Sequence, residues 1–157
     1  MKSIEKIVGS SIRCVEYTAL LLLMMLACLT VVGVVCRYVF NNPITWADEV
    51  SRYIFVWCTF LGATLVLRKN EHLSINFILN KFPGKIRQII STYLLFAMCV
   101  FLVIIAVGGF TIANMNRIQI SPAAGIPMSI PYLAIPANAV LMLMVLAEKW
   151  VKNCKRG

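Results

Sequence analysis

Four long stretches of the chain contain no Asp, Glu, Lys, Arg or His, and their lengths strongly constrain the fold. They are Tyr17–Cys36 (20 residues), Tyr53–Leu67 (15), Gln88–Asn116 (29) and Ile118–Ala147 (30). Roughly 20 apolar residues in a helix cross the hydrocarbon core of a bilayer. The second stretch is shorter, but its helix can begin upstream at Trp46 and leave the nearby charges at the interface. The pattern therefore predicts membrane-spanning helices.

The overall composition agrees with this interpretation. Of the 157 residues, 61% are hydrophobic and 13% are charged, whereas soluble domains carry about a quarter charged residues. The apolar residues are contiguous and do not alternate, which argues against a β-barrel. We predict an all-α integral membrane protein that forms one domain over residues 1–157. Its four transmembrane helices are expected at about 15–37, 46–68, 86–112 and 130–150.

The basic residues predict the orientation of these helices. Twelve of the 15 Lys and Arg residues lie in the N-terminal segment, the middle connection and the C-terminal tail, against three on the other two connections. The positive-inside rule then places both termini and the middle connection in the cytoplasm. The formal charge of +9 does not indicate nucleic acid, because the basic residues lie between apolar runs and form no continuous face.

The middle connection has the pattern of a helix lying on the membrane surface. Over residues 73–82, apolar side chains recur at the spacing of one helix face, with polar side chains opposite, and Pro83-Gly84 follows. Basic residues flank this predicted cytoplasmic amphipathic helix, and we expect them to contact anionic phospholipid headgroups. They are Arg68, Lys69, Lys81, Lys85 and Arg87.

The sequence offers little for catalysis or metal binding. The six cysteines include no Cys-x-x-Cys pair, and His72 is the one histidine, which excludes bis-histidine haem and multi-histidine metal sites. Carriers usually place ionisable groups at membrane depth, but here the central turns of every predicted span lack them. Glu16 is reminiscent of small four-helix carriers with one glutamate in the first helix, yet it precedes the apolar run. We expect neither an enzyme nor a cofactor.

Polar residues concentrate around the start of the second predicted span. Thr45 and Asp48 have the spacing of a capping box, and Asp48 and Arg52 that of an i, i+4 pair. Glu49 and Arg52 lie three apart on one helix face, within reach of each other. Capping alone does not explain the whole cluster, so we expect it to hold another subunit. The predicted interface residues are Arg37, Trp46, Asp48, Glu49, Arg52 and Trp57.

At these residues the chain resembles the DctQ-like small membrane subunits of tripartite ATP-independent periplasmic (TRAP) transporters. The resemblance covers nearly the whole chain, and Asn76 and Asn138 depart from it, where an acid and a glycine are common. The residues that carry it are Arg37-Tyr-x-Phe40, Trp46-x-x-Glu49-x-x-Arg52, Trp57, Phe60-Leu-Gly-Ala63, Arg68, His72, Ser121, Ile126-Pro127, Tyr132 and Ile135-Pro136.

The resemblance implies a bacterial inner-membrane protein that works with two partners. A periplasmic binding protein would capture an organic acid, such as a C4-dicarboxylate or sialic acid. A large membrane subunit would carry the substrate and sodium sites and move as an elevator. The small subunit would be a static scaffold that braces the elevator and helps the binding protein to dock. A stand-alone small carrier and a membrane assembly factor outside transport remain as alternatives.

Overall fold

The computed structural model describes residues 2–69 and 84–154, and these residues form four long helices. The helices are α1 (Lys2–Tyr38), α2 (Thr45–Lys69), α4 (Gly84–Met115) and α5 (Ser129–Cys154). Each contains a segment long and apolar enough to cross a membrane. In lipid a helix satisfies its backbone hydrogen bonds internally, which is why continuous apolar runs take this form.

The four spans predicted from the sequence are confirmed as helices, although their bounds differ. The candidate spans run over Gly9–Tyr38, Thr45–Lys69, Thr92–Met115 and Ser129–Glu148. The helices extend past the predicted spans because helical hydrogen bonding continues into the polar flanks. The predicted amphipathic helix at 73–82 lies outside the described residues.

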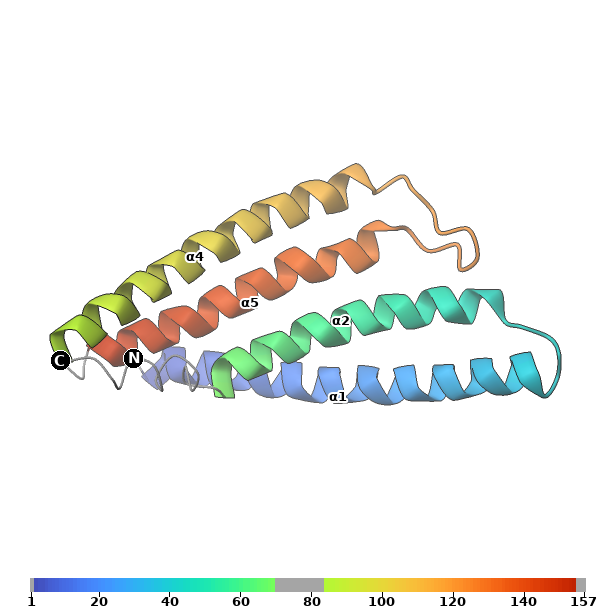
Figure 1. Ribbon diagram of the computed structural model, residues 1–157, viewed down its shortest axis with the longest axis horizontal. Helices are drawn as coiled ribbons and strands as arrows, with labels where there is room; N and C mark the ends of the chain where they lie inside the picture. The colour runs from blue at the N-terminus through green and yellow to red at the C-terminus, as the bar shows by residue number, and fades with distance from the viewer. Residues whose placement is uncertain (1, 70–83, 155–157) are drawn as a thin grey trace.

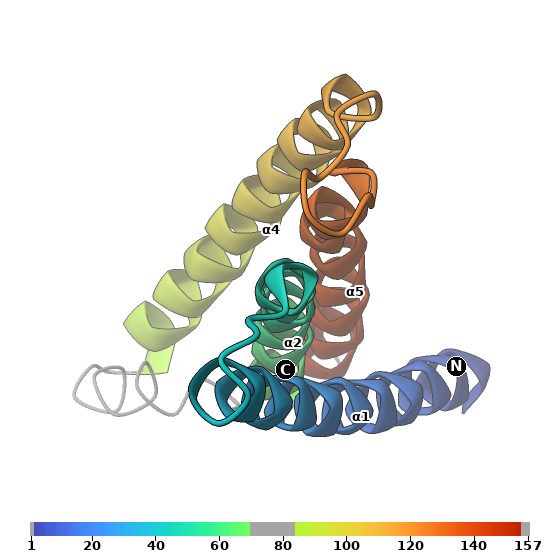
Figure 2. The same cartoon turned by 90° about the vertical axis from the view of Figure 1, so that its right-hand side faces the viewer.

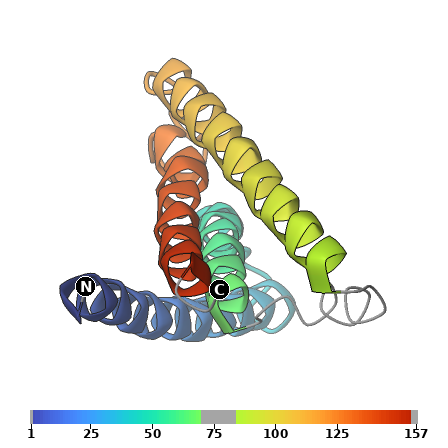
Figure 3. The ribbon, with the colours of Figure 1, turned by 90° about the vertical axis from the view of Figure 1, so that its left-hand side faces the viewer.

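The helices lie lengthwise beside one another, with the α1–α2 and α4–α5 connections at the same end of the molecule (Figure 1). We call this the connection end. The main contacts run from α1 to α2, from α2 to α5 and from α5 to α4, and a smaller contact joins α1 to α5. Viewed from either end, α4 slants away from α1, with α2 and α5 between them (Figures 2 and 3). Helix α5 is therefore the common neighbour of the other three.

Helices α4 and α5 share the main apolar core. Leu95 and Leu102 of α4 pack with Ala139 and Leu146 of α5. Closer to the connection end, Gly109 is buried against α5: a Cβ atom placed on it would lie 2.8 Å from Ile135 Cγ2 and 2.9 Å from Pro136 Cδ. Small residues permit such close approach of membrane helices. Gly109 therefore sets how near α4 lies to α5.

A polar pair joins α2 to α5 inside the apolar region. Thr64 and Asn138 are 0% and 1% exposed. The Thr64 hydroxyl lies 3.2 Å from Asn138 Oδ1 and 3.3 Å from the Phe60 carbonyl, and Asn138 Nδ2 donates to the Ala134 carbonyl at 2.8 Å. Both side chains are thus satisfied where no water is expected, which is the condition for burying polar groups in lipid.

Many large apolar side chains of the helices are exposed on the outside of the isolated chain. In α1, no residue of the most apolar window is buried, and large side chains such as Tyr17 and Met24 are almost three-quarters exposed. Contiguous apolar surface on this scale requires lipid or a protein partner. Several faces of the isolated chain therefore require lipid or another protein against them.

Candidate functional site: the connection end of the helices

Two adjacent acids lie near the start of α2 at the connection end, Asp48 in its first turn and Glu49 directly after it. Helix α1 ends at Tyr38, and the chain reverses through Asn41, whose φ of 49° is left-handed. Such a conformation suits asparagine. Helix α2 then begins at Thr45, as the capping pattern predicts. Acids in a first turn also face the positive end of the helix dipole. Asp48 and Glu49 follow at once, and their carboxylates have different partners.

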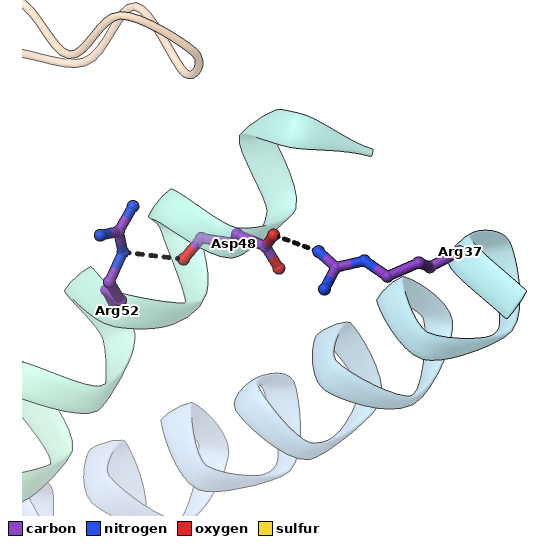
Figure 4. A network of polar contacts seen from close by, with 3 residues as sticks. All are labelled: Arg37, Asp48 and Arg52. Carbon is purple, nitrogen blue, oxygen red and sulfur yellow. Dashed lines mark hydrogen bonds and ion pairs between the residues drawn. The ribbon is translucent and has the colours of Figure 1, made fainter. Parts of the chain in front are cut away.

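Asp48 connects α2 to the end of α1. Its Oδ2 lies 2.5 Å from Arg37 Nη2 in an ion pair (Figure 4). Arg52, one turn further along α2, donates from Nε to the backbone carbonyl of Asp48 at 3.3 Å. The sequence predicts a side-chain pair of Asp48 and Arg52, and this prediction is wrong. The Asp48 carboxylate pairs with Arg37 instead, because the end of α1 lies beside it.

Glu49 connects α2 to the α4–α5 connection. It is 8% exposed, and its Oε2 accepts three hydrogen bonds: from the Ser121 hydroxyl, and from the backbone N–H groups of Ala123 at 3.2 Å and Ala124 at 2.9 Å. Successive N–H groups that converge on one anionic oxygen form a nest. The sequence predicts a Glu49–Arg52 contact on one helix face. The bonds of Glu49 instead reach a segment more than 70 residues away.

The α4–α5 connection has a defined shape around this carboxylate. The N–H of Ser121 donates to Ile126 O at 2.9 Å, and the N–H of Met128 donates to Gln119 O at 2.8 Å. Gly125 closes the turn with a φ of 66°, a conformation that glycine adopts without strain. At its end, the Tyr53 hydroxyl of α2 lies 3.3 Å from Met128 Sδ. We call residues 116–128 the outer loop.

The two acids differ in how strongly they hold their partners. The side chains of Arg37 and Asp48 are 49% and 59% exposed, and an exposed ion pair contributes about 0–1 kcal/mol. Glu49 instead accepts three hydrogen bonds at a position that is 8% exposed, and a buried donor left unpaired is costly. Glu49 is therefore the stronger of the two links at this end.

The other predicted interface residues remain accessible. Trp46 is half exposed, Arg52 is exposed and Trp57 is partly buried. Together with Arg37 and Asp48, these side chains surround the first turns of α2. They are available to a partner, whereas Glu49 is already engaged within the chain.

Sequence reasoning missed the Glu49 nest, although one signal for it was present. Ser121 belongs to the stretch that carries the family resemblance, followed by Pro122, two alanines and Gly125. A serine before small residues and a glycine is typical of a turn with exposed N–H groups. Nothing in the spacing, however, indicates which acid such a turn would meet.

At the opposite end, two of the predicted lipid-contacting residues touch α1. Lys69 Nζ lies 3.1 Å from Glu16 Oε1, and a Cβ atom on Gly9 would lie 3.9 Å from Arg68 Nη2. Glu16 is therefore paired at the end of the helices away from the outer loop. Lys85 and Arg87 lie in the first turn of α4, and Lys81 lies outside the described residues.

Across residues 2–69 and 84–154, no three His, Cys, Asp or Glu side chains come together as metal ligands. The carboxylates described above are occupied by arginine, lysine or loop donors. The arrangement can fix helix ends and present polar and aromatic side chains on the surface.

The comparisons with known proteins define the family. The family model for the DctQ component of tripartite ATP-independent periplasmic transporters matches residues 26–156. The chain is 29% identical over 143 residues, 90% of its length and 88% of the relative's, to a putative TRAP transporter small permease protein of Haemophilus influenzae.

Two further relatives extend the comparison. One is the sialic acid TRAP transporter permease protein SiaT of Haemophilus influenzae, 32% identical over 79% of this chain and 20% of that protein. The other is the C4-dicarboxylate TRAP transporter small permease protein DctQ of Vibrio cholerae, 26% identical over 52% of this chain and 35% of that protein.

The fold and the family match together define a multi-pass membrane component of a transporter, not an enzyme. The chain belongs to the DctQ family, the small permease subunits of TRAP transporters. A tripartite system implies a large membrane subunit and a periplasmic binding protein beside it.

Proposed function

We propose that this chain is a non-catalytic scaffold of a TRAP transporter, which braces the large elevator subunit and helps the binding protein to dock. The central turns of its four spans contain no Asp, Glu, Lys, Arg or His, which is the observation that carries the proposal. Coupled transport usually requires ionisable groups at membrane depth. In this proposal those groups, and the sodium sites, belong to the large subunit.

The transported solute is proposed to be an organic acid of the C4-dicarboxylate or sialic acid class. Support comes from the names of two relatives, one described as a sialic acid and one as a C4-dicarboxylate transporter component. The SiaT match also supports the partnership with the large subunit, because the matched segment makes up 20% of a much longer permease.

The exposed apolar helix faces support the scaffold role. Lipid can cover some of them, and a second subunit others. The polar side chains around the first turns of α2 are proposed to contact the partners: Arg37, Trp46, Asp48, Arg52 and Trp57 directly, and Glu49 through the outer loop. Arg68, Lys69, Lys81, Lys85 and Arg87 are proposed to meet anionic headgroups, each worth about 1 kcal/mol near such a surface.

The scaffold role predicts that transport requires all three components. Proteoliposomes with the large subunit and this chain, supplied with binding protein and a sodium gradient, should take up the organic acid. Liposomes with this chain alone should take up none, because its spans lack coupling groups. Uptake by this chain alone would favour the stand-alone carrier, and full uptake by the large subunit without this chain would remove the need for a scaffold.

The orientation is proposed to place the outer loop in the periplasm and both termini in the cytoplasm, in the bacterial inner membrane. Cys14 lies in the N-terminal half of α1, before the apolar run that begins at Tyr17, and is exposed. In intact cells carrying a variant with Cys14 as its sole cysteine, a membrane-impermeant thiol reagent should react only after the membrane is opened. A sole cysteine introduced as Ile118→Cys should react at once. The reverse pattern would invert the orientation.

A further inference from the structure

We propose that Glu49 is the internal anion of the outer loop, by which we mean the buried carboxylate that accepts the loop's hydrogen bonds. We also propose that it positions this loop for the binding protein without contacting the large subunit. The inference rests on the proposed function for its docking step. It also revises the expectation drawn from the sequence, in which Glu49 itself belongs to the subunit interface.

The geometry of the nest supports the first half of the proposal. The Ser121 hydroxyl and the N–H groups of Ala123 and Ala124 all point to one oxygen of Glu49. Ser121 is 2% exposed and Glu49 is 8% exposed. Three donors brought together in a buried place would repel one another without an acceptor. The carboxylate therefore determines the local fold of the loop.

The position of the loop supports the second half. Ser121 and Ala124 face the body of the molecule through Glu49, while Ile118 on the other part of the loop is 93% exposed and Ile120 is 64% exposed. These side chains lie beyond the end of the candidate span Thr92–Met115. A rigid loop that displays bare isoleucines beyond the membrane region suits contact with the soluble component of the system. An ordered loop also loses less conformational entropy on binding.

Because Asp48 and Glu49 hold different segments, the role of Glu49 in the outer loop can be tested separately from the link between α1 and α2. Asp48 holds α1 through an exposed ion pair, and Glu49 holds the outer loop from a buried position. Substitution of Glu49 therefore acts on the loop, while Asp48 keeps its ion pair with Arg37. A defect in docking and a defect in subunit assembly should then appear in different measurements.

The test compares Glu49→Gln with Glu16→Gln in the reconstituted complex. Glu16 also carries a carboxylate in an ion pair, but at the opposite end of the helices, so it is a matched control. Glu49→Gln keeps the side chain's shape and removes the charge. Glu49→Asp keeps the charge on a shorter side chain, and Ser121→Ala removes one donor, so both provide graded variants if the loop tolerates the glutamine poorly.

The first measurement is hydrogen exchange at the amides of Ala123 and Ala124. Loss of charged hydrogen bonds should speed exchange at least about tenfold in Glu49→Gln, less in Glu49→Asp and Ser121→Ala, and not at all in Glu16→Gln. Wild-type exchange in Glu49→Gln would overturn the role of Glu49 as the internal anion.

The second measurement is uptake as a function of binding-protein concentration. In Glu49→Gln, the concentration that gives half-maximal uptake should rise several-fold, with the rate at saturation and the co-purification of the large subunit as in the wild type. Glu49→Asp should recover part of the shift. Reduced co-purification with an unchanged half-saturating concentration would overturn the positioning role and return Glu49 to the subunit interface. Wild-type uptake without any binding protein would overturn the proposed function, whereas the exchange measurement tests the nest independently.

Discussion

Gly109→Ala is expected to destabilise the protein, although alanine is the better helix former. An added Cβ would lie 2.8 Å from Ile135 Cγ2, 2.9 Å from Pro136 Cδ and 3.2 Å from Ile135 Cβ. The proline ring is closed and the Ile135 Cβ is fixed by the backbone, and the β-branched Ile135 side chain has little freedom to rotate in a helix. The two helices must therefore separate, and overpacking of this kind costs about 1–3 kcal/mol. Thermal unfolding in detergent should show a lower Tm.

The adjacent glycine provides the matched control. Gly108 is exposed, and a Cβ on it meets nothing within 4 Å. Gly108→Ala should leave Tm unchanged or raise it, since alanine is favoured over glycine in a helix interior by about 1 kcal/mol. Of the two variants, only Gly109→Ala should therefore lower Tm. If Gly109→Ala is as stable as Gly108→Ala, the close packing of α4 on α5 at this level is not present in the protein.

Asn138→Asp is expected to destabilise the protein more than Gly109→Ala does, although aspartate and asparagine have nearly the same shape. The oxygen that replaces Nδ2 would face the Ala134 carbonyl at the 2.8 Å distance of the present hydrogen bond, so an ionised carboxylate would meet an acceptor there. A charged aspartate at the centre of a membrane helix costs about 2.5–3.5 kcal/mol on insertion scales. The yield of folded protein and its Tm should both fall at pH 8.

Asn138→Leu separates the effect of charge from that of a lost hydrogen bond. Leucine removes the amide, but the Thr64 hydroxyl keeps the Phe60 carbonyl, 3.3 Å away, as an acceptor. Interhelical hydrogen bonds in membranes contribute about 0.6 kcal/mol on average, so this change should be mild. At pH 5 part of the loss in Asn138→Asp should be regained, because a protonated carboxyl can donate to Ala134. An aspartate variant as stable as the wild type at pH 8 would mean that water reaches this site.

The number and placement of the four helices follow from the sequence because the signal is local. A run of apolar residues between charged flanks is sufficient to predict a membrane helix, and α5, for example, begins within one residue of the predicted position. Which helices touch is another matter. Spans that are apolar on every side carry little information about the face that packs, so neither the contact at Gly109 nor the pair of Thr64 and Asn138 could be predicted.

In the candidate site, too, local features could be predicted from the sequence and contacts between distant segments could not. The sequence indicates that the polar cluster at the start of α2 matters, and the structure places most of those side chains on an accessible surface. The hydrogen-bond partners of the two carboxylates could not be predicted, because helical spacing reveals only neighbours three or four residues away, such as Arg52, which does attract the charge of Glu49. Asp48 pairs across a turn with Arg37, and Glu49 bonds to a loop 72 to 75 residues along the chain. Such contacts depend on how whole helices are arranged.

The central place of α5 has a consequence for how the protein is made. Helix α5 packs against α1, α2 and α4, while the main packing of α4 is on α5 alone. Because α5 comes last of the four along the chain, the first three helices enter the membrane before their common neighbour exists. During synthesis the nascent protein is a hairpin of α1 and α2 with an unattached α4. The packing of α4, and the closure of the outer loop over Glu49, must therefore wait until α5 arrives, whereas α1 and α2 can pair before it.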